Sequence, residues 1–252
     1  MSGNHMPGDL LKISGLSRSF GGVQAVAGFD LRIGADELLC IIGPNGCGKT
    51  TLFNLISGHL RPSFGSIQFK GAEITGMAPH LVARSGIGRK FQVPSIYEDL
   101  SVSENLAVAD FAEPGRKGLG GLFTSRTGND RRLANLIGLI GLEELAGAPA
   151  GHLSHGQRQW LEIGMVLATG PDLILLDEPT AGMTRQETER TAQLVQAMNR
   201  EQGVAVILIE HDMWFVETLK CAVAVMMQGQ VIAKGDYDTV RELDMVKEAY
   251  LG

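Results

Sequence analysis

The stretch of sequence that decides the fold is Gly43-Pro44-Asn45-Gly46-Cys47-Gly48-Lys49-Thr50. The apolar run Leu38–Ile42 comes directly before this loop, and a pattern with helical spacing, Lys49–Ser57, follows it. An uninterrupted apolar run is typical of a strand buried on both faces. Glycines allow successive N–H groups to point inward at phosphate oxygens, and the positive end of the helix adds to the attraction. The strand, loop and helix together predict a phosphate-binding loop in an α/β protein.

The chemistry of this loop predicts a bound nucleoside triphosphate together with Mg²⁺. We expect Lys49 to reach the β- and γ-phosphates, Thr50 to ligate Mg²⁺ and Thr51 to steady the α-phosphate. A helix N-terminus favours a thiolate at Cys47, but a small side chain that fits the loop is the preferred interpretation. In either case the thiol would make the protein sensitive to alkylation. The residues expected to bind nucleotide here are Gly43, Pro44, Asn45, Gly46, Cys47, Gly48, Lys49, Thr50 and Thr51.

A second apolar run ends in two carboxylates. Leu173–Leu176 leads into Asp177 and Glu178, and ligands of open α/β sheets bind where strands end in this way. Adjacent carboxylates repel unless they serve different tasks. We expect Asp177 to hold Mg²⁺ through water and Glu178 to polarise the attacking water.

Three further motifs complete a fixed order along the chain. They are Gln92 in Lys90-Phe91-Gln92, the pentad Leu153-Ser154-His155-Gly156-Gln157, and His211 after the apolar run Val204–Ile209. With the phosphate-binding loop and the Asp177-Glu178 pair, this order resembles the ATP-binding cassette (ABC) ATPase family from about Leu10 to Gly252.

The resemblance implies a role for each of these three motifs. Gln92 would contact Mg²⁺ and the water, and His211 would hydrogen-bond the γ-phosphate and hold Glu178 and the water in place. Ser154, the backbone of Gly156 and the helix from Gln157 would bind the γ-phosphate held by a partner's loop. A second ABC ATPase subunit follows, a paralogue by preference, with a homodimer also possible.

Several of these assignments have alternatives or departures from the family pattern. Ser154 is also a common helix N-cap. Phe20 stands where the family places an aromatic that stacks on adenine, yet packing in the core is equally compatible with it. His155 stands where glycine is usual, and Thr184 where aspartate is usual, which puts the contact across the dimer from that segment in doubt.

The remaining apolar pattern predicts a P-loop NTPase core with a mixed sheet, an antiparallel β subdomain and an inserted α-helical subdomain. The core would comprise residues 10–91 and 166–252, the inserted subdomain about 92–165, and residues 1–9 a flexible N-terminus. Expected strands are Leu10–Ser14, Phe29–Ile33, Leu38–Ile42, Ser66–Lys70, Leu173–Leu176, Val204–Ile209 and Val223–Met227. Expected helices are Lys49–Ser57, Ser103–Phe111, Asp130–Ile140, Gln157–Leu167 and Thr184–Glu201. The basic stretch Arg116–Arg132 favours a solvated face over a docking patch.

Composition limits the class of function. The 252 residues are 44% hydrophobic and 20% charged, with a net charge of −6 that argues against a nucleic-acid partner. Three cysteines without paired spacing indicate free thiols in a reducing compartment. Apolar runs such as Ala222–Met227 are far shorter than the roughly 20 residues that span a bilayer. We therefore expect a chain that is soluble when isolated, and the resemblance implies a peripheral position on the cytoplasmic face of the inner membrane.

A single cassette without membrane helices favours the ATPase subunit of a bacterial ABC importer. Finer resemblance in Gly88–Pro94, Gln159–Met165, Ala181–Thr184 and Tyr250–Gly252 indicates the branch for branched-chain amino acids, urea and short amides, with urea or short amides preferred. Two permease subunits would dock through Gln92–Leu106, and a periplasmic solute-binding protein would act indirectly.

Two other classes remain open. A soluble ABC ATPase that acts on DNA or ribosomes fits the motifs, but the acidic charge counts against it. A P-loop kinase would leave the pentad unexplained.

Overall fold

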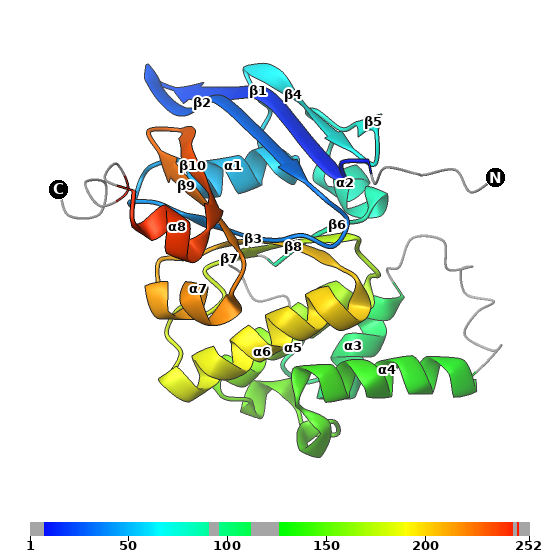
Figure 1. Cartoon of the computed structure of the whole chain (residues 1–252). Helices are drawn as coiled ribbons and strands as arrows, with labels where there is room; N and C mark the ends of the chain where they lie inside the picture. The colour runs from blue at the N-terminus through cyan, green and yellow to red at the C-terminus, as the bar shows by residue number, and fades with distance from the viewer. Residues whose placement is uncertain (1–7, 91–95, 112–125, 244–245, 247–252) are drawn as a thin grey trace, which may run out of the picture.

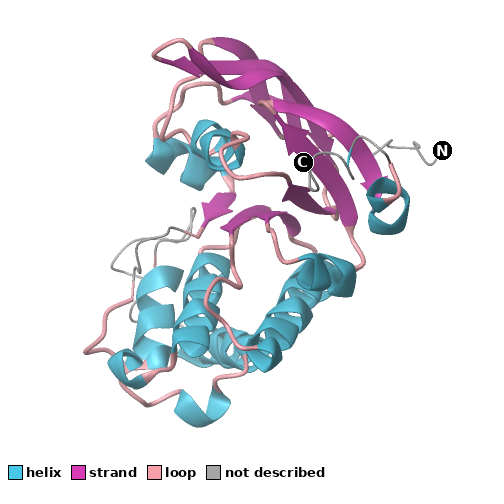
Figure 2. Cartoon of the chain, turned by 90° about the vertical axis from the view of Figure 1, so that its left-hand side faces the viewer, coloured by secondary structure: helices cyan, strands magenta, loops and turns pink. Residues whose placement is uncertain are grey.

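The computed structural model describes residues 8–90, 96–111, 126–243 and 246 of the chain. This part of the molecule is built in layers, with an antiparallel sheet uppermost in Figure 1, a central sheet below it and most of the helices at the bottom. Figure 2 separates the strands, in magenta, from the lower group of helices, in cyan. The predicted α/β class, with a mixed sheet, an antiparallel sheet and helices, is confirmed.

The central sheet has the strand order β10-β9-β3-β8-β7-β6. In that order its strands are Gln230–Asp236, Ala222–Met227, Leu38–Ile42, Ala205–Ile209, Leu173–Asp177 and Ile87–Arg89. The strands from β9 to β6 are parallel, whereas β10 pairs antiparallel with β9. Because parallel strands end at one edge, the segments that follow β3, β6, β7 and β8 all emerge on the same side of the molecule.

The apolar runs of the sequence are strands covered on both faces. In β7 the side chains alternate, so that Leu173 and Leu175 join one hydrophobic cluster while Ile174 and Leu176 join the other. All five residues of β7 and of β8 are buried. Burial on both faces is the physical reason for an unbroken apolar run in place of alternation.

The antiparallel sheet has the order β2-β1-β4-β5. Its strands are Val23–Ile33, Leu11–Phe20, Phe64–Phe69 and Ala72–Glu73. Helix α1, Lys49–Ile56, lies between this sheet and the central one (Figure 1). Phe29 of β2, Phe53 of α1 and Ile41 of β3 belong to one buried cluster, which fixes the two sheets around the helix.

Seven helices follow α1 in the described residues; α2 packs in the same hydrophobic cluster as α1, and most of the others cover the opposite face of the central sheet. The seven are α2 (Pro79–Ser85), α3 (Val102–Asp110), α4 (Arg126–Ile140), α5 (His155–Ala168), α6 (Arg185–Gln202), α7 (Met213–Leu219) and α8 (Tyr237–Arg241), with short 3₁₀ turns at Glu143–Leu145 and Ala150–His152. Ser101, Ser154 and Thr184 begin α3, α5 and α6 with capping boxes. These boxes satisfy first-turn N–H groups that would otherwise lack partners.

Several elements differ from the sequence prediction. Strand β1 runs on to Phe20, well past Ser14, because register shifts between Ile13 and Ser19 let it continue without regular alternation. The short elements β6 and α7 and the edge strand β10 were not predicted, since such short or half-exposed segments carry little periodicity. Helix α5 continues to Ala168, and the proposed subdomain limits stay a prediction.

No helix in the described ranges combines the length and the apolar character needed to cross a bilayer.

Candidate nucleotide site

The candidate site forms where four parallel strands end. The phosphate-binding loop follows β3, Asp177 and Glu178 end β7, His211 follows β8, and Lys90 follows β6. Strand β8 lies between β3 and β7 in the sheet, so the loop and the carboxylates flank one strand end. Topology therefore brings together residues that are more than a hundred positions apart in sequence, at the edge where open α/β sheets bind ligands.

The phosphate-binding loop is packed tightly against the backbone of neighbouring strands. A Cβ atom at Gly43 would lie 2.1 Å from the carbonyl oxygen of Met226, and one at Gly48 would lie 2.0 Å from that of Ala25. Both glycines also have positive φ, 155° and 107°. Space and conformation together exclude a side chain at these two positions.

Helix α1 begins at this loop without a side-chain cap, so its first N–H groups face the loop. Lys49 is buried, and its Nζ donates to the carbonyl oxygens of Gly43 and Pro44 at 2.7 and 3.0 Å. A cation and free N–H groups in one loop make a binding site for an anion such as a phosphate group. The predicted loop contacts to nucleotide fit this geometry.

Cys47 is not an activated thiol. Its side chain is only 6% exposed, and burial raises the pKa of the thiol although Lys49 Nζ, 3.8 Å from Sγ, acts in the opposite direction. The interpretation of Cys47 as a small residue that fits the loop is the one the geometry favours.

Asp177 has the properties of a metal-binding carboxylate. It is 9% exposed, and burial raises its pKa, while Arg89, Lys49 and the hydroxyl of Thr50 act to lower it. Its Oδ2 atom lies 3.8 Å from Nη2 of Arg89 and receives no hydrogen bond within the described residues. A buried carboxylate oxygen with spare acceptor capacity beside a threonine hydroxyl fits Mg²⁺, which prefers oxygen ligands.

Glu178 has an unusual backbone conformation, with φ of 47°, in a region that non-glycine residues rarely adopt. Its N–H donates to the carbonyl of Ile209 at 3.0 Å, which ties the end of β7 to the end of β8. Oε1 of Glu178 lies 3.6 Å from Nδ1 of His211, and both side chains are partly exposed. Strained backbone of this kind gathers at functional sites. The structure thus brings together the predicted base and the predicted histidine.

Two residues of the site were given no role by the sequence. Glu210 is 1% exposed and accepts hydrogen bonds from the N–H and hydroxyl of Thr180, at 3.1 and 2.6 Å, and from the N–H of His211, at 3.1 Å. Nη1 of Arg89 donates to Oδ1 of Asn54 and Oγ of Ser57 at 2.7 and 2.8 Å, while its Nη2 lies 3.8 Å from Oδ2 of Asp177. A charged residue directly after the apolar run Val204–Ile209 was the available signal for Glu210, whereas the short strand β6 gave no such signal for Arg89.

Lys90 and Glu162 form a buried ion pair that joins the end of β6 to α5. Nζ of Lys90 lies 3.5 Å from Oε2 of Glu162, and the two side chains are 6% and 8% exposed. Burial lowers the pKa of Lys90 and raises that of Glu162, while each charge opposes the shift of the other. The pair connects the nucleotide edge of the sheet to the helix that the pentad begins.

The pentad opens helix α5. Ser154 is its N-cap and forms a capping box with Gln157, whose side chain accepts the Ser154 N–H at 2.9 Å. The role of helix N-cap, considered above as the alternative for Ser154, is therefore present. The N-cap does not exclude the binding role, because Ser154 remains exposed.

Phe20 and Gln92 are the other two residues that the sequence predicts for the site. Phe20 is 42% exposed at the end of β1, and the guanidinium of Arg18 lies 4.8 Å from its ring centre. The alternative interpretation, that Phe20 packs in the core, is therefore wrong. Gln92 lies outside the described residues, as does most of the basic stretch 116–132. Arg132, at its end, pairs with the buried Asp110 at 2.9 Å.

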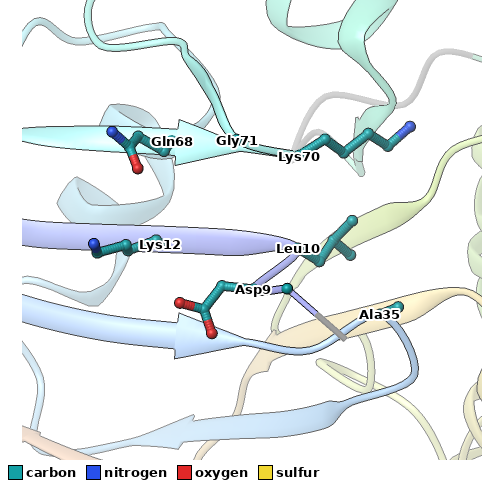
Figure 3. A pocket seen from close by; sticks show the side chains of 8 residues that line it. Asp9, Leu10, Lys12, Ala35, Gln68, Lys70 and Gly71 are labelled. Carbon is teal, nitrogen blue, oxygen red and sulfur yellow. The ribbon is translucent and has the colours of Figure 1, made fainter. Parts of the chain in front are cut away.

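A separate depression lies at the opposite end of the strands (Figure 3). Asp9, Lys12, Gln68 and Lys70 are among the residues that line it. Ala35, which also borders it, precedes β3, whereas the phosphate-binding loop follows β3. It is therefore no part of the candidate nucleotide site.

Comparison with known proteins agrees with this geometry. A family profile described as ABC transporter matches residues 26–181. The chain is 37% identical over 251 residues to the high-affinity branched-chain amino acid transport ATP-binding protein BraF of Pseudomonas aeruginosa, covering 96% of this chain and 98% of BraF. It is 34% identical over 249 residues to LivG of Escherichia coli, a protein of the same description, covering 96% and 98%.

Solved structures that resemble the chain are also ATP-binding cassettes of ABC transporters. A nucleotide-free ATP-binding cassette from an ABC transporter superposes with a TM-score of 0.82 at 30% identity, covering 97% of this chain and 100% of the cassette. The ADP conformation of MJ1267, an ATP-binding cassette of an ABC transporter, has a TM-score of 0.83 at 30% identity, covering 97% and 99%.

Proposed function

The chain belongs to the ABC transporter family as an ATP-binding cassette with transport-coupled ATP hydrolysis, and we propose that it is the ATPase subunit of an importer for small polar solutes. One observation carries the proposal. The loop with Lys49, the Asp177-Glu178 pair and His211 meet at one edge of the sheet, and the same chain carries a signature pentad at the start of α5. Such a combination serves hydrolysis shared between two cassettes.

Each residue has one task in this proposal. Lys49 and the first N–H groups of α1 would hold the phosphates, and Thr50 and Asp177 would hold Mg²⁺, which would supply neutralisation of the phosphate charge. Glu178 accepts a proton from the attacking water. His211, 3.6 Å from Glu178, holds that carboxylate in place. Gln92 remains the proposed contact to Mg²⁺ and water from the segment after β6.

A second cassette completes the site. Ser154 and the backbone of Gly156 act on the nucleotide held by the partner chain, because within one chain the pentad begins a helix of the lower layer while the phosphate-binding loop follows β3. We favour a paralogue as this partner, with a homodimer as the alternative.

The permease subunits dock on the segment that leads from the nucleotide edge into α3. Tyr97 is 54% exposed and Glu98 is also exposed, while their backbone is held by Asn105 and Gly151. A fixed backbone with an exposed aromatic and an acid suits a docking surface. Replacing both side chains by alanine should impair uptake and leave the ATP affinity of the isolated chain unchanged. Normal uptake by cells carrying that double variant would place the permease elsewhere.

The cargo is proposed from the relatives' names, since the transported solute does not enter the nucleotide site. BraF and LivG are named for branched-chain amino acid transport, so we place branched-chain amino acids first. The preference for urea or short amides drawn from the sequence has no support among these relatives, nor has action on DNA or ribosomes. Uptake of labelled leucine and labelled urea in cells with and without the gene separates the two cargoes.

The enzymatic part of the proposal is tested with three full-length proteins. Glu178→Gln should bind ATP, lose hydrolysis and sediment as an ATP-dependent dimer, alone or with its paralogue. Lys49→Ala should lose hydrolysis by about a hundredfold or more, the range found when one preorganised charge-stabilising group is removed. A Glu178→Gln protein that turns over ATP at the wild-type rate would falsify the assignment of the base.

A further inference from the structure

Both residues that depart from the family pattern lie where two loops meet. His155 is the first residue of α5, and its Nε2 lies 3.0 Å from the carbonyl oxygen of Ala181, in the segment that follows β7. Thr184, at the end of that segment, is the N-cap of α6. The unusual histidine therefore contacts the segment that ends in the unusual threonine.

A single carboxylate spans the same two loops. Oε2 of Glu187 accepts hydrogen bonds from the N–H and the hydroxyl of Thr184, both at 2.9 Å. Its other oxygen, Oε1, faces Gly156, where an added Cβ atom would lie only 2.5 Å from it. The Thr184 N–H and hydroxyl lower the pKa of Glu187, with a smaller contribution from the Gly156 N–H. One side chain is thus in contact with the cap of α6 and with the pentad.

A third contact joins α5 and α6 about one helical turn further from their N-termini. Nε1 of Trp160 on α5 donates to Oγ1 of Thr191 on α6 at 2.9 Å. That threonine is fully buried, and its hydroxyl lies 3.2 Å from Sδ of Met183, in the segment after β7. The contacts at Glu187 and Thr191 lie about one turn apart on α6, and the contact at Ala181 lies in the segment that precedes this helix.

We propose that Glu187 is a positioning residue that ties the pentad to the segment Ala181–Thr184, with His155 as the second tie, so that both loops move as one unit when two cassettes close on ATP. This inference rests on the proposed two-chain function. Thr184, which cannot supply the usual aspartate contact, acts here by holding the carboxylate. His155 supplies a side-chain contact that glycine cannot make.

The chemistry of the carboxylate gives a variant that separates the tie from simple helix capping. Glutamine keeps one acceptor oxygen, so Glu187→Gln can still accept from Thr184 and preserve the capping box. Its second group is an NH₂ donor, which cannot replace the carboxylate oxygen that faces Gly156. Glu187→Ala removes both contacts. Glu189→Gln, on the same helix and exposed, is the matched control.

Hydrogen exchange of the full-length chain tests the tie without any partner. Glu187→Gln should raise amide exchange in the peptide that contains residues 154–160 by about tenfold, the change expected when one contact to a charged group is lost. The melting temperature and the affinity for ATP should stay at the wild-type values, as they should in Glu189→Gln. Unchanged exchange in that peptide would overturn the proposal and leave Glu187 as a helix cap.

Steady-state ATP hydrolysis by the assembled transporter gives the second readout. Glu187→Gln and His155→Gly should each lower kcat several-fold with little change in KM, and the double variant should lose less than the product of the two effects, because both act on one unit. Full kcat in Glu187→Gln would contradict the tie. Hydrolysis that survives Lys49→Ala would instead contradict the proposed function, and the exchange comparison would still stand.

Discussion

The two halves of the proposed site are held in place by different means. The loop at α1 is positioned by backbone, with Gly43 and Gly48 lying against the carbonyl groups of Met226 and Ala25. The pentad at α5 is positioned by side chains that reach across from other elements, Glu187 from α6 and Lys90 from the end of β6. The glycines that position the loop are part of its own short stretch of sequence, whereas the side chains that position the pentad come from outside the stretch that contains it.

The contrast predicts that the largest loss of stability follows a break in the buried pair behind the pentad. Lys90→Met leaves the Glu162 carboxylate buried without its partner, which we expect to cost about 3–5 kcal/mol in the free energy of unfolding. Urea denaturation measures it. The double variant Lys90→Met with Glu162→Leu should recover much of the loss, because neither charge then remains buried. If Lys90→Met were as stable as the wild type, the pair would not position α5.

A smaller loss is expected on the backbone side. Gly48→Ala introduces a Cβ atom 2.0 Å from the carbonyl oxygen of Ala25 at a φ of 107°, and we expect a cost of about 2–3 kcal/mol together with loss of ATP binding. Gly46→Ala is the control, since its φ is 78° but no atom lies within 4 Å of the added Cβ. Equal losses in the two variants, measured by urea denaturation, would show that conformation matters here and close packing does not.

The smallest effect on stability is expected at the pentad itself. Ser154→Ala removes the N-cap of α5, worth about 1 kcal/mol in the free energy of unfolding. ATP affinity of the isolated chain should not change, because Ser154 acts on the nucleotide of the partner, while hydrolysis by the assembled pair should fall. A loss of ATP affinity in the isolated chain as large as that of Lys49→Ala would place both halves of the site within one chain.

Much of the fold and of the site could be predicted because it depends on local pattern. Strand β3 has the predicted bounds, Leu38–Ile42, since an apolar run flanked by turns has one interpretation when a glycine-rich loop follows it. The placement of Glu178 beside His211 agrees with the expectation drawn from the family. Phe20 was ambiguous because an aromatic at the end of a strand serves a core and a surface equally well, and only its exposure of 42% decides against the core.

The sequence by itself determined the phosphate-binding loop and the Asp177-Glu178 pair, because each depends on residues that are neighbours along the chain. It also determined the family, because the order of the motifs is a property of the sequence. Only the tertiary structure decided that Glu210 is buried under Thr180, that Lys90 pairs with Glu162 and that Glu187 contacts the pentad. The reason is physical. The desolvation of a charge and the identity of its partner are set by what the fold brings within a few ångströms, and no spacing along the chain records that distance.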